Sequence, residues 1–497
     1  MLVPIKLPPG MFRNGTEYES KGRWYDGSLV RWENGRLKPI GGCTVVLSGG
    51  ATLTGKARRF ETWRDNNRFR YAAVGTHSKL YIGSGGTYTD VTPGALVTGN
   101  ADGNAGQGYG AGNYGAGAYG TPRLTGNLWN EADTWSFATW GENLECVLTS
   151  DQYIWEFKPS TGLVAKVTNA PQCKAVLTTD EFFLMAIAAG GDPRKLQWCD
   201  QGANTVWTPT ATNLAGSLEL QTQGMLKVGH RVGTQALYFT DIDVHTLDYV
   251  GAPLVYGRRK LGENCGIIGP NAFAATETTG FWMGLGCFWS YDGVVRPLPC
   301  DVQDYIFNDI NSGQYAKVYA GVNSRYNEIT WFYPSAASIE NDRYVTFNYK
   351  EKIWYFGQRV RLVWEDRGVF NTPLSVDASG NVWAEETGFL EGGSTRVGSV
   401  YAQSGPTEIG NGDKIVYANL LLPDADNGSI LNLTAKTRFA PQGPLSTTGP
   451  FTLAPNAEGY APARFAGRQV AVRLDITADQ AFAFGTPRVV VQAGGGR

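Results

Sequence analysis

Three side chains that could bind a metal ion alternate along the sequence: Asp241, Asp243 and His245. On a β-strand, alternate side chains point to one face about 6 to 7 Å apart, which suits a metal site if other strands supply further ligands. A solvated strand face or a turn gives the same pattern, and a complete site needs more ligands than one short segment offers. We therefore predict no metal centre and no cofactor.

A second candidate for chemistry is the run Gly50 to Ala57, which nearly matches a nucleotide-binding P-loop. Ala57 stands where the loop needs a hydroxyl to bind magnesium. The next residues, Arg58 to Phe60, have the pattern of a strand where the motif requires a helix. We predict an ordinary turn and no nucleotide hydrolysis.

Hydrolytic chemistry has little support. The chain has 3 histidines and no G-x-S-x-G nucleophile motif. A pair of carboxylates for glycoside cleavage stays open, because the separation of two carboxylates in space is invisible in a sequence. From the residues alone we predict no catalytic residues and expect that the chain is not an enzyme.

The segment Ser375 to Trp383 comes within one inserted residue of the Asp-box hairpin of sialidase propellers. In such a hairpin the carboxylate of Asp377 would accept hydrogen bonds from turn amides, and Trp383 would pack between blades. The motif therefore indicates a fold and gives no indication of catalysis.

The composition predicts that short strands position these residues. Gly 64, Pro 24 and 12% aromatic residues accompany only 18% charged residues, and turn pairs such as Asp26-Gly27 separate the apolar runs. We expect more than a third of the chain in strands and less than a tenth in helices. One short helix is predicted to begin near Asp301, and 497 residues are too many for a single sandwich.

A repeat is visible in the tryptophans. Trp155, Trp198, Trp289 and Trp331 are 43, 91 and 42 positions apart, and Leu247 lies near the middle of the long gap. A period of about 45 residues is typical of propeller blades, although a Trp-rich β-protein can give some even spacings by chance. We predict an all-β fold, a β-propeller of about six to eight irregular blades with a C-terminal β-sandwich domain.

The predicted domains follow from this pattern. Residues 1–59 form an N-terminal hairpin segment that is expected to close the propeller, and residues 60–390 form the propeller itself, with a Gly- and Tyr-rich insertion at 94–126. Beyond residue 390 charge and tryptophan content both fall, so residues 391–497 are assigned to the β-sandwich.

Several classes of function are disfavoured. A formal charge of −2 gives no general attraction to phosphates, so tight DNA binding is not expected. The 7 cysteines are scattered and contain no C-x-x-C, which argues against disulfides and zinc knuckles. The longest apolar run, Phe182 to Ala189, is far short of the roughly 18 residues of a membrane span. No secretory signal follows Met1, so we expect synthesis in a cytoplasm.

Short motifs in a fixed order over much of the chain resemble the tail nozzle or tail hub proteins of short-tailed bacteriophages, a family that includes packaged-DNA stabilisation proteins. The motifs are Asn14-Gly15-Thr16, Gly22-Arg23-Trp24, Asp26-Gly27, Pro39 to Gly42, Trp135-Ser136-Phe137, Trp140 to Leu144, Gly266 to Ala272, Phe281 to Gly284, Tyr291-Asp292-Gly293, Asp304 to Phe307 and Asn327 to Pro334.

The resemblance implies a virion structural protein of the tail, assembled in the host cytoplasm. Such a subunit belongs to a homo-oligomeric ring, usually a hexamer, that attaches to the portal and adaptor complex and to other tail proteins. The ring retains the packaged genome and forms the channel for DNA ejection. Double-stranded DNA would pass without specific binding, for which a nearly neutral wall is suitable.

A glycan-binding or glycan-cleaving propeller of a phage tail, acting in receptor recognition, is the alternative. It is motivated by the 15 tryptophans and the Asp-box-like run. That function predicts an exposed tryptophan beside a pair of carboxylates in one concave pocket.

The insertion at 94–126 cannot bury a core of its own. We predict that it is an arm contacting another subunit or the contents of the channel, with Tyr109, Tyr114 and Tyr119 as its anchors. A loose solvated loop is the other interpretation.

Overall fold

The computed structural model describes residues 1–46, 52–105, 129–408, 414–440 and 443–494. With 48% strand and 5% helix, the fold is all-β, as the composition predicts. Tyr109, Tyr114 and Tyr119 lie outside the described residues, so the structure leaves their predicted role as an inter-subunit or channel arm open.

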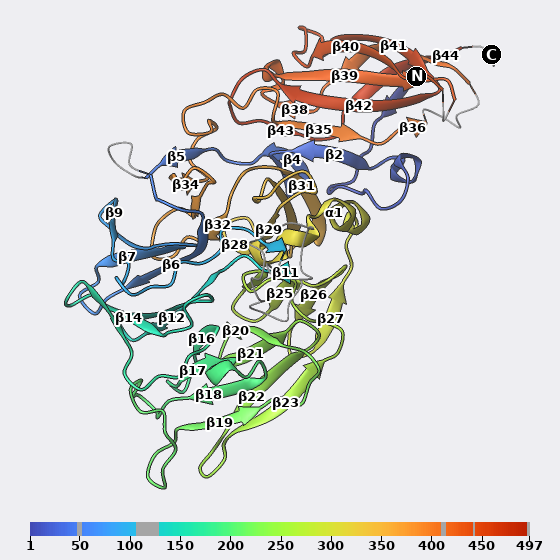
Figure 1. Cartoon of the computed structure of the whole chain (residues 1–497). Coiled ribbons are helices and arrows are strands. Elements are labelled where there is room, and N and C mark those ends of the chain that lie inside the picture. Colours follow the sequence, from blue (N-terminus) through green and yellow to red (C-terminus); the bar gives the residue numbers. More distant parts are fainter. Residues whose placement is uncertain (47–51, 106–128, 409–413, 441–442, 495–497) are drawn as a thin grey trace, which may run out of the picture.

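Seven of the four-stranded antiparallel sheets among the described residues are the blades of a β-propeller (Figure 1). Blade 1 consists of β6 (Ala57–Arg64), β7 (Arg70–Thr76), β8 (Leu80–Ser84) and β9 (Thr87–Asp90), and blade 2 of β12 (Trp135–Trp140), β13 (Asn143–Leu148), β14 (Trp155–Lys158) and β15 (Leu163–Lys166). Blade 3 consists of β16 (Ala175–Thr178), β17 (Leu184–Ile187), β18 (Lys195–Trp198) and β19 (Gly216–Glu219), and blade 4 of β20 (Leu226–Val232), β21 (Gln235–Thr240), β22 (Val244–Gly251) and β23 (Val255–Gly262). Blade 5 consists of β24 (Phe273–Ala275), β25 (Gly280–Met283), β26 (Phe288–Tyr291) and β27 (Val295–Leu298), and blade 6 of β28 (Tyr319–Asn323), β29 (Glu328–Tyr333), β30 (Arg343–Asn348) and β31 (Ile353–Gln358). Blade 7 consists of β32 (Val363–Glu365), β33 (Leu374–Val376), β34 (Val382–Glu385) and β5 (Cys43–Val45).

The first strands of successive blades contact one another in a closed circle, β6, β12, β16, β20, β24, β28, β32 and back to β6. The circle is closed by a strand from far away in the sequence, because β5 pairs with β34 as the fourth strand of blade 7. Such closure leaves no open edge between the first and the last blade.

The tryptophan repeat follows the blades. Trp155, Trp198 and Trp289 lie on β14, β18 and β26, the third strands of blades 2, 3 and 5, and Leu247 lies on β22, the third strand of blade 4. Trp331 lies on β29, the second strand of blade 6. The repeat therefore marks the third strand in blades 2 to 5 and the second strand in blade 6.

The sandwich combines both ends of the chain (Figure 1). Its sheets are β1 (Leu2–Pro4), β44 (Arg488–Ala493), β37 (Val416–Leu422) and β41 (Ala461–Gly467); β2 (Trp24–Ser28), β35 (Tyr401–Ser404), β42 (Gln469–Ile476), β39 (Leu431–Arg438) and β40 (Ser446–Thr452), with β36 (Thr407–Glu408) on β42; and a smaller sheet of β3 (Val30–Glu33), β4 (Arg36–Pro39), β43 (Ala483–Phe484) and β38 (Ala425–Asp426). Along β39 buried and partly exposed residues alternate, which is the pattern of a strand with one face on a core.

Strand pairing divides the N-terminal segment that the sequence treats as one hairpin unit. β1, β2 and β4 pair with β44, β35 and β43 of the sandwich, whereas β5 pairs with the propeller. The alternation of aromatic and polar residues in residues 1–46 predicts strands but cannot identify their partners, which lie more than 300 positions away.

Helical structure is short. α1 (Gln303–Asp309) follows Val302 and buries Ile306, one residue or two later than the predicted start near Asp301. Single turns of 3-10 helix are η1 (Glu17–Ser20), η3 (Ala189–Gly191), η4 (Ser312–Lys317) and η5 (Gly428–Ile430). Within the described residues no helix is long and apolar enough to cross a membrane.

Candidate functional site

The described part of the P-loop-like run, residues 52–57, contains a bend and leads into a strand. β6 begins at Ala57, where a nucleotide-binding loop would start a helix. The backbone N–H of Lys56 donates to Nδ1 of His77 at 3.0 Å, and its ammonium group donates to the carbonyl of Ala378 at 2.7 Å. The lysine that would hold a phosphate therefore links blade 1 to blade 7, as the turn interpretation predicts.

Asp241, Asp243 and His245 do not line one strand face. Asp241 lies in the turn between β21 and β22 and accepts the backbone N–H of Met225 at 2.7 Å. Asp243 accepts hydroxyls from Thr240 and Thr222 at 2.5 and 2.7 Å, and Nε2 of His245 lies 3.1 Å from it. Burial lowers the pKa of His245. Among the described residues no group of His, Cys, Asp and Glu is arranged to hold a metal ion.

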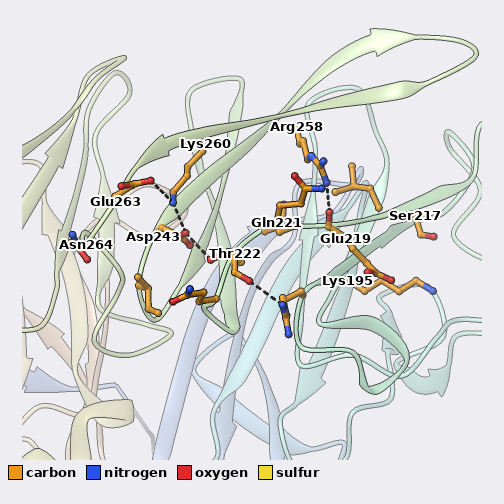
Figure 2. Close-up of a pocket in the computed structure, with 15 residues that line it drawn as sticks. Lys195, Ser217, Glu219, Gln221, Thr222, Asp243, Arg258, Lys260, Glu263 and Asn264 are labelled. Atoms are coloured by element: carbon orange, nitrogen blue, oxygen red, sulfur yellow. Dashed lines mark hydrogen bonds and ion pairs between the residues drawn. The ribbon is translucent and has the colours of Figure 1, made fainter.

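Asp243 belongs to the wall of an open groove of about 1010 Å³ between blades 3 and 4, which we call the rim groove (Figure 2). Lys260 lies 3.1 Å from Asp243 and donates to Glu263 at 2.9 Å. Arg258 donates to the carbonyl of Glu219 at 2.7 Å, and so links β23 to β19 across the gap (Figure 2). Arg258 thus joins the two blades, whereas Lys260, Asp243 and Glu263 pair with one another on the blade 4 side.

A second hollow, of about 660 Å³, lies where the first strands of blades 2 to 6 begin, and we call it the mouth pocket. Its wall includes Asn100, Trp129, Glu131, Asp133, Lys174 and Lys227. Trp129 belongs to β11 (Trp129–Asn130), which pairs with β10 (Asn104–Ala105) at the base of the insertion. Its side chain is 45% exposed, and its indole N–H donates to the carbonyl of Gly313 at 3.2 Å.

Two carboxylates accompany this tryptophan. Glu131 forms an ion pair with Lys227, with oxygens 2.6 and 2.8 Å from the ammonium nitrogen. Asp133 accepts the hydroxyl of Thr149 and the backbone N–H of Asn100, both at 2.7 Å. An exposed tryptophan beside carboxylates in a concave pocket is the arrangement expected of a glycan-binding propeller.

The base of the insertion is anchored on the propeller. The carboxylate of Asp102 lies 2.5 Å from the ammonium of buried Lys317. Gly103 and the side chain of Gln314 exchange two hydrogen bonds of 2.9 Å, and Arg58 donates to the carbonyl of Ala101 at 2.6 Å. The chain on both sides of residues 106–128 is therefore fixed, by Arg58 to blade 1 and by Gly313, Gln314 and Lys317 to the segment before blade 6.

A third group of acids is hidden inside blade 2. Glu145 and Glu156 lie directly opposite each other on β13 and β14, and the amide of Asn204 donates to both, at 2.8 and 3.2 Å. Burial, with the charge of Glu156 beside it, raises the pKa of Glu145 to about 8. Because the Glu145 side chain is fully buried, the pair faces the protein interior.

Buried ion pairs join the sandwich to the propeller. Arg31 of β3 lies 2.8 Å from Glu328 of blade 6 and 2.5 Å from Glu386, which follows blade 7. Burial raises the pKa of Glu328 to about 7, although Arg31 acts in the opposite direction. The guanidinium of Arg31 also stacks on the ring of Tyr326, with 3.7 Å between the guanidinium carbon and the ring centre.

A second set of pairs extends the same junction. Arg359 and Arg361 bind Glu385 at 2.8 and 2.5 Å and also bind Glu391 at 2.9 and 2.5 Å. Burial alone would raise the pKa of Glu391, but the two arginines outweigh it and lower that pKa to about 2. We call the two sets together the junction network.

The Asp-box-like run forms the hairpin turn between β33 and β34. Asp377 accepts the backbone N–H groups of Ser379 and Asn381 at 2.8 and 3.0 Å. It also accepts the indole N–H of Trp383 at 2.9 Å. The role predicted for Asp377, a structural acceptor in a propeller hairpin, is confirmed.

Comparisons with known proteins find solved structures of low similarity. No family model matches the chain, and no curated protein matches it. Virginiamycin B lyase from Staphylococcus aureus shares 6% identity at a TM-score of 0.41, covering 67% of this chain and 96% of the lyase. BamB from Moraxella catarrhalis shares 10% identity at 0.35, covering 67% and 95%, and BBS1N, solved in complex with ARL6DN, shares 9% at 0.39, covering 72% and 97%.

One expectation from the sequence is corrected by these comparisons. The prediction that the chain is not an enzyme does not stand, because the propellers similar to it include a lyase. The reason is general: a fold of this kind carries many functions, and the residue patterns that argued against hydrolases say nothing of other reactions. None of the three similar proteins is a phage tail protein.

Proposed function

We propose that the chain is a virion structural protein, a subunit of the tail nozzle ring of a short-tailed bacteriophage. The observation that carries this proposal is that motifs behind the resemblance, far apart in sequence, contact one another. Asn14 donates to the carbonyl of Cys300 at 2.7 Å and accepts the backbone N–H of Asp304 at 3.1 Å. The backbone N–H of Gly15 donates to the carboxylate of Asp304 at 3.3 Å.

A second cluster of these motifs lies around the loop Gly266 to Ala272. Trp331 of β29 donates its indole N–H to the carbonyl of Ala272 at 3.0 Å. A β-carbon at Gly266 would lie 2.2 Å from the backbone of Asp241, so only glycine fits there. Residues in contact constrain one another's identity. Several short motifs in a fixed order therefore support a shared fold better than any single motif does.

The junction network supports a mechanical role. Arg31 of the sandwich binds Glu328 of blade 6 and Glu386 after blade 7, and Arg359 and Arg361, between blades 6 and 7, bind Glu385 and Glu391 in and next to blade 7. Breaking one partner of such a buried group leaves an uncompensated charge, so the two parts resist separation. A subunit that must hold a pressurised genome needs this rigidity.

In this proposal the DNA passes between subunits, because the hollow lined by the first strands of blades 1 to 4 is too small for a duplex. This hollow measures about 210 Å³ and is lined by residues such as Arg59, Glu61 and His230. The net charge of −2 is suitable for a wall that DNA slides along.

The hairpin of β22 and β23 offers a surface for a neighbouring subunit. In Figure 1 it reaches the end of the molecule opposite the sandwich. Its tip exposes Tyr249, Val250 and Leu254, and the Leu254 side chain is 72% exposed. A cluster of exposed apolar residues at a projecting tip is typical of a contact with another protein.

The experiment is to produce the chain together with the portal and adaptor proteins of the same phage and to image the product by electron microscopy. We expect a closed ring of six copies below the adaptor. Isolated single copies on virions, or a fibre trimer, would rule the proposal out.

A pair of variants tests the hairpin in the same assay. Leu254→Glu is expected to abolish ring formation while the monomer stays folded, because a charge at the centre of an apolar contact cannot be desolvated. Leu163→Glu is the matched control, since Leu163 is 68% exposed on the β14–β15 hairpin of another blade. Equal assembly of both variants would show that the β22–β23 tip makes no contact between subunits.

A further inference from the structure

We infer that the mouth pocket binds a saccharide, with Trp129 as the platform on which a sugar ring stacks. The inference is independent of the nozzle proposal, because it rests on the geometry of this pocket alone. Three features carry it: a rigid exposed indole, fixed polar groups around it, and charges that are already paired.

The indole of Trp129 is held in one orientation although nearly half of its surface is open. Its N–H donates to Gly313, and its backbone pairs with Ala105 across the β10–β11 ladder. The ring packs against the backbone of Gly313 so closely that a β-carbon there would lie 2.8 Å from it. A flat apolar surface that is fixed before binding loses little conformational entropy when a ligand covers it.

The groups around the indole are both donors and acceptors and are held by their neighbours. Asp133 is fixed by Thr149 and Asn100, and the amide of Asn130 lies 3.5 Å from the side-chain oxygen of Asn104. A sugar offers C–H groups on its face and hydroxyls at its edge, which match an aromatic surface surrounded by fixed polar groups.

The charges of the pocket disfavour the main competing ligands. Glu131 and Lys227 neutralise each other, so the wall offers no cluster of free cations for a phosphate group. Lys174 is an exposed donor that also lines the pocket. A hydroxyl-rich ligand uses single donors of this kind without requiring a net positive charge.

The size of the hollow agrees with this chemistry. Pockets that bury compact ligands measure roughly 300 to 1000 Å³. The mouth pocket, at about 660 Å³, therefore has room for a short oligosaccharide. Met225, 46% exposed on its wall, supplies a further apolar contact.

The test is binding of the fluorescently labelled full chain to a printed array of defined oligosaccharides and of bacterial surface polysaccharides. The strongest ligand is then titrated by calorimetry. We expect saturable binding, weakened at least tenfold by Trp129→Ala and several-fold by Lys174→Ala, while Trp129→Phe keeps part of the affinity.

Phe69→Ala is the control, because Phe69 is an exposed aromatic residue, 62% accessible, on the β6–β7 turn. It is expected to leave saccharide binding unchanged. Among the described residues Lys174 forms no hydrogen bond or ion pair with the base of the insertion, so its variant separates a loss of the ligand from a loss of local structure. No binding anywhere on the array would overturn the inference, and so would binding that Trp129→Ala and Phe69→Ala change equally.

Discussion

The junction network and the acid pair of blade 2 both bury carboxylates, but they differ in what faces those carboxylates. At the junction every buried glutamate has an arginine within 3 Å. In blade 2, Glu145 has an amide at 2.8 Å and another glutamate opposite it on the next strand. The comparison teaches that burial alone does not decide the charge of an acid, because the neighbouring charges contribute as well.

The pKa values express this difference. Two arginines lower the pKa of Glu391 to about 2, whereas burial and Glu156 raise that of Glu145 to about 8. At neutral pH Glu391 is therefore held by ionic attraction, whereas burial raises the pKa of Glu328 to about 7 in spite of Arg31. Glu145 of blade 2 carries a proton and, as a neutral acid, accepts the amide of Asn204.

The largest effect is expected from Arg31→Met at the junction. The substitution removes the cation from between Glu328 and Glu386 and leaves two buried acids without it. We expect a loss of about 3 to 5 kcal/mol in the free energy of unfolding, measured by denaturant titration at pH 7. A loss below about 1 kcal/mol would mean that solvent reaches the junction and screens its charges.

Glu145→Gln is expected to raise the free energy of unfolding rather than lower it. The folded protein keeps the proton of Glu145 up to a pH of about 8, while the unfolded chain releases it near the ordinary value of 4.5. Stability from this group is thus complete below pH 4.5 and decreases as the pH rises toward 8. The glutamine needs no proton, so the variant should be more stable than the wild type by about 1 to 3 kcal/mol at pH 8 and nearly equal to it at pH 4.

The measurement is the midpoint of thermal unfolding at intervals from pH 4 to pH 9. Glu458→Gln, at an exposed position in the sandwich, is the matched control and should follow the wild type throughout. A constant difference between Glu145→Gln and the wild type at every pH would show that Glu145 does not change its protonation on folding.

The propeller could be predicted from the sequence because its signals are local. Trp155, Trp198 and Trp289 repeat at equivalent third strands, and Asp377 forms its turn within four residues. The registry of Glu145 with Glu156 depends only on one hairpin, but which face of that hairpin is buried is set by the next blade. Local periodicity identifies strands and blades, whereas the burial of a side chain depends on the neighbouring blade.

The junction and the mouth pocket could not be predicted for a different reason. Arg31 meets Glu328 and Glu386 at separations of 297 and 355 positions, which no local pattern encodes. Trp129 follows a Gly-rich run in which an indole has no obvious partner, and only the contact with Gly313 shows that it is fixed. Residues that the closure of the propeller brings together can be identified only in the folded chain.

The smallest effect is expected for Arg36→Met, which makes the same chemical change one strand away from Arg31. Arg36 of β4 pairs with Asp426 at 3.3 Å, but the two side chains are 57% and 76% exposed. Water and salt screen such a pair, so the free energy of unfolding should change by no more than about 0.5 kcal/mol. Denaturant titrations at low and high sodium chloride would measure it, with any small loss disappearing at high salt. A loss as large as that of Arg31→Met, or one that persists at high salt, would mean that exposure does not separate these two arginines and that β3 and β4 stabilise the junction through packing.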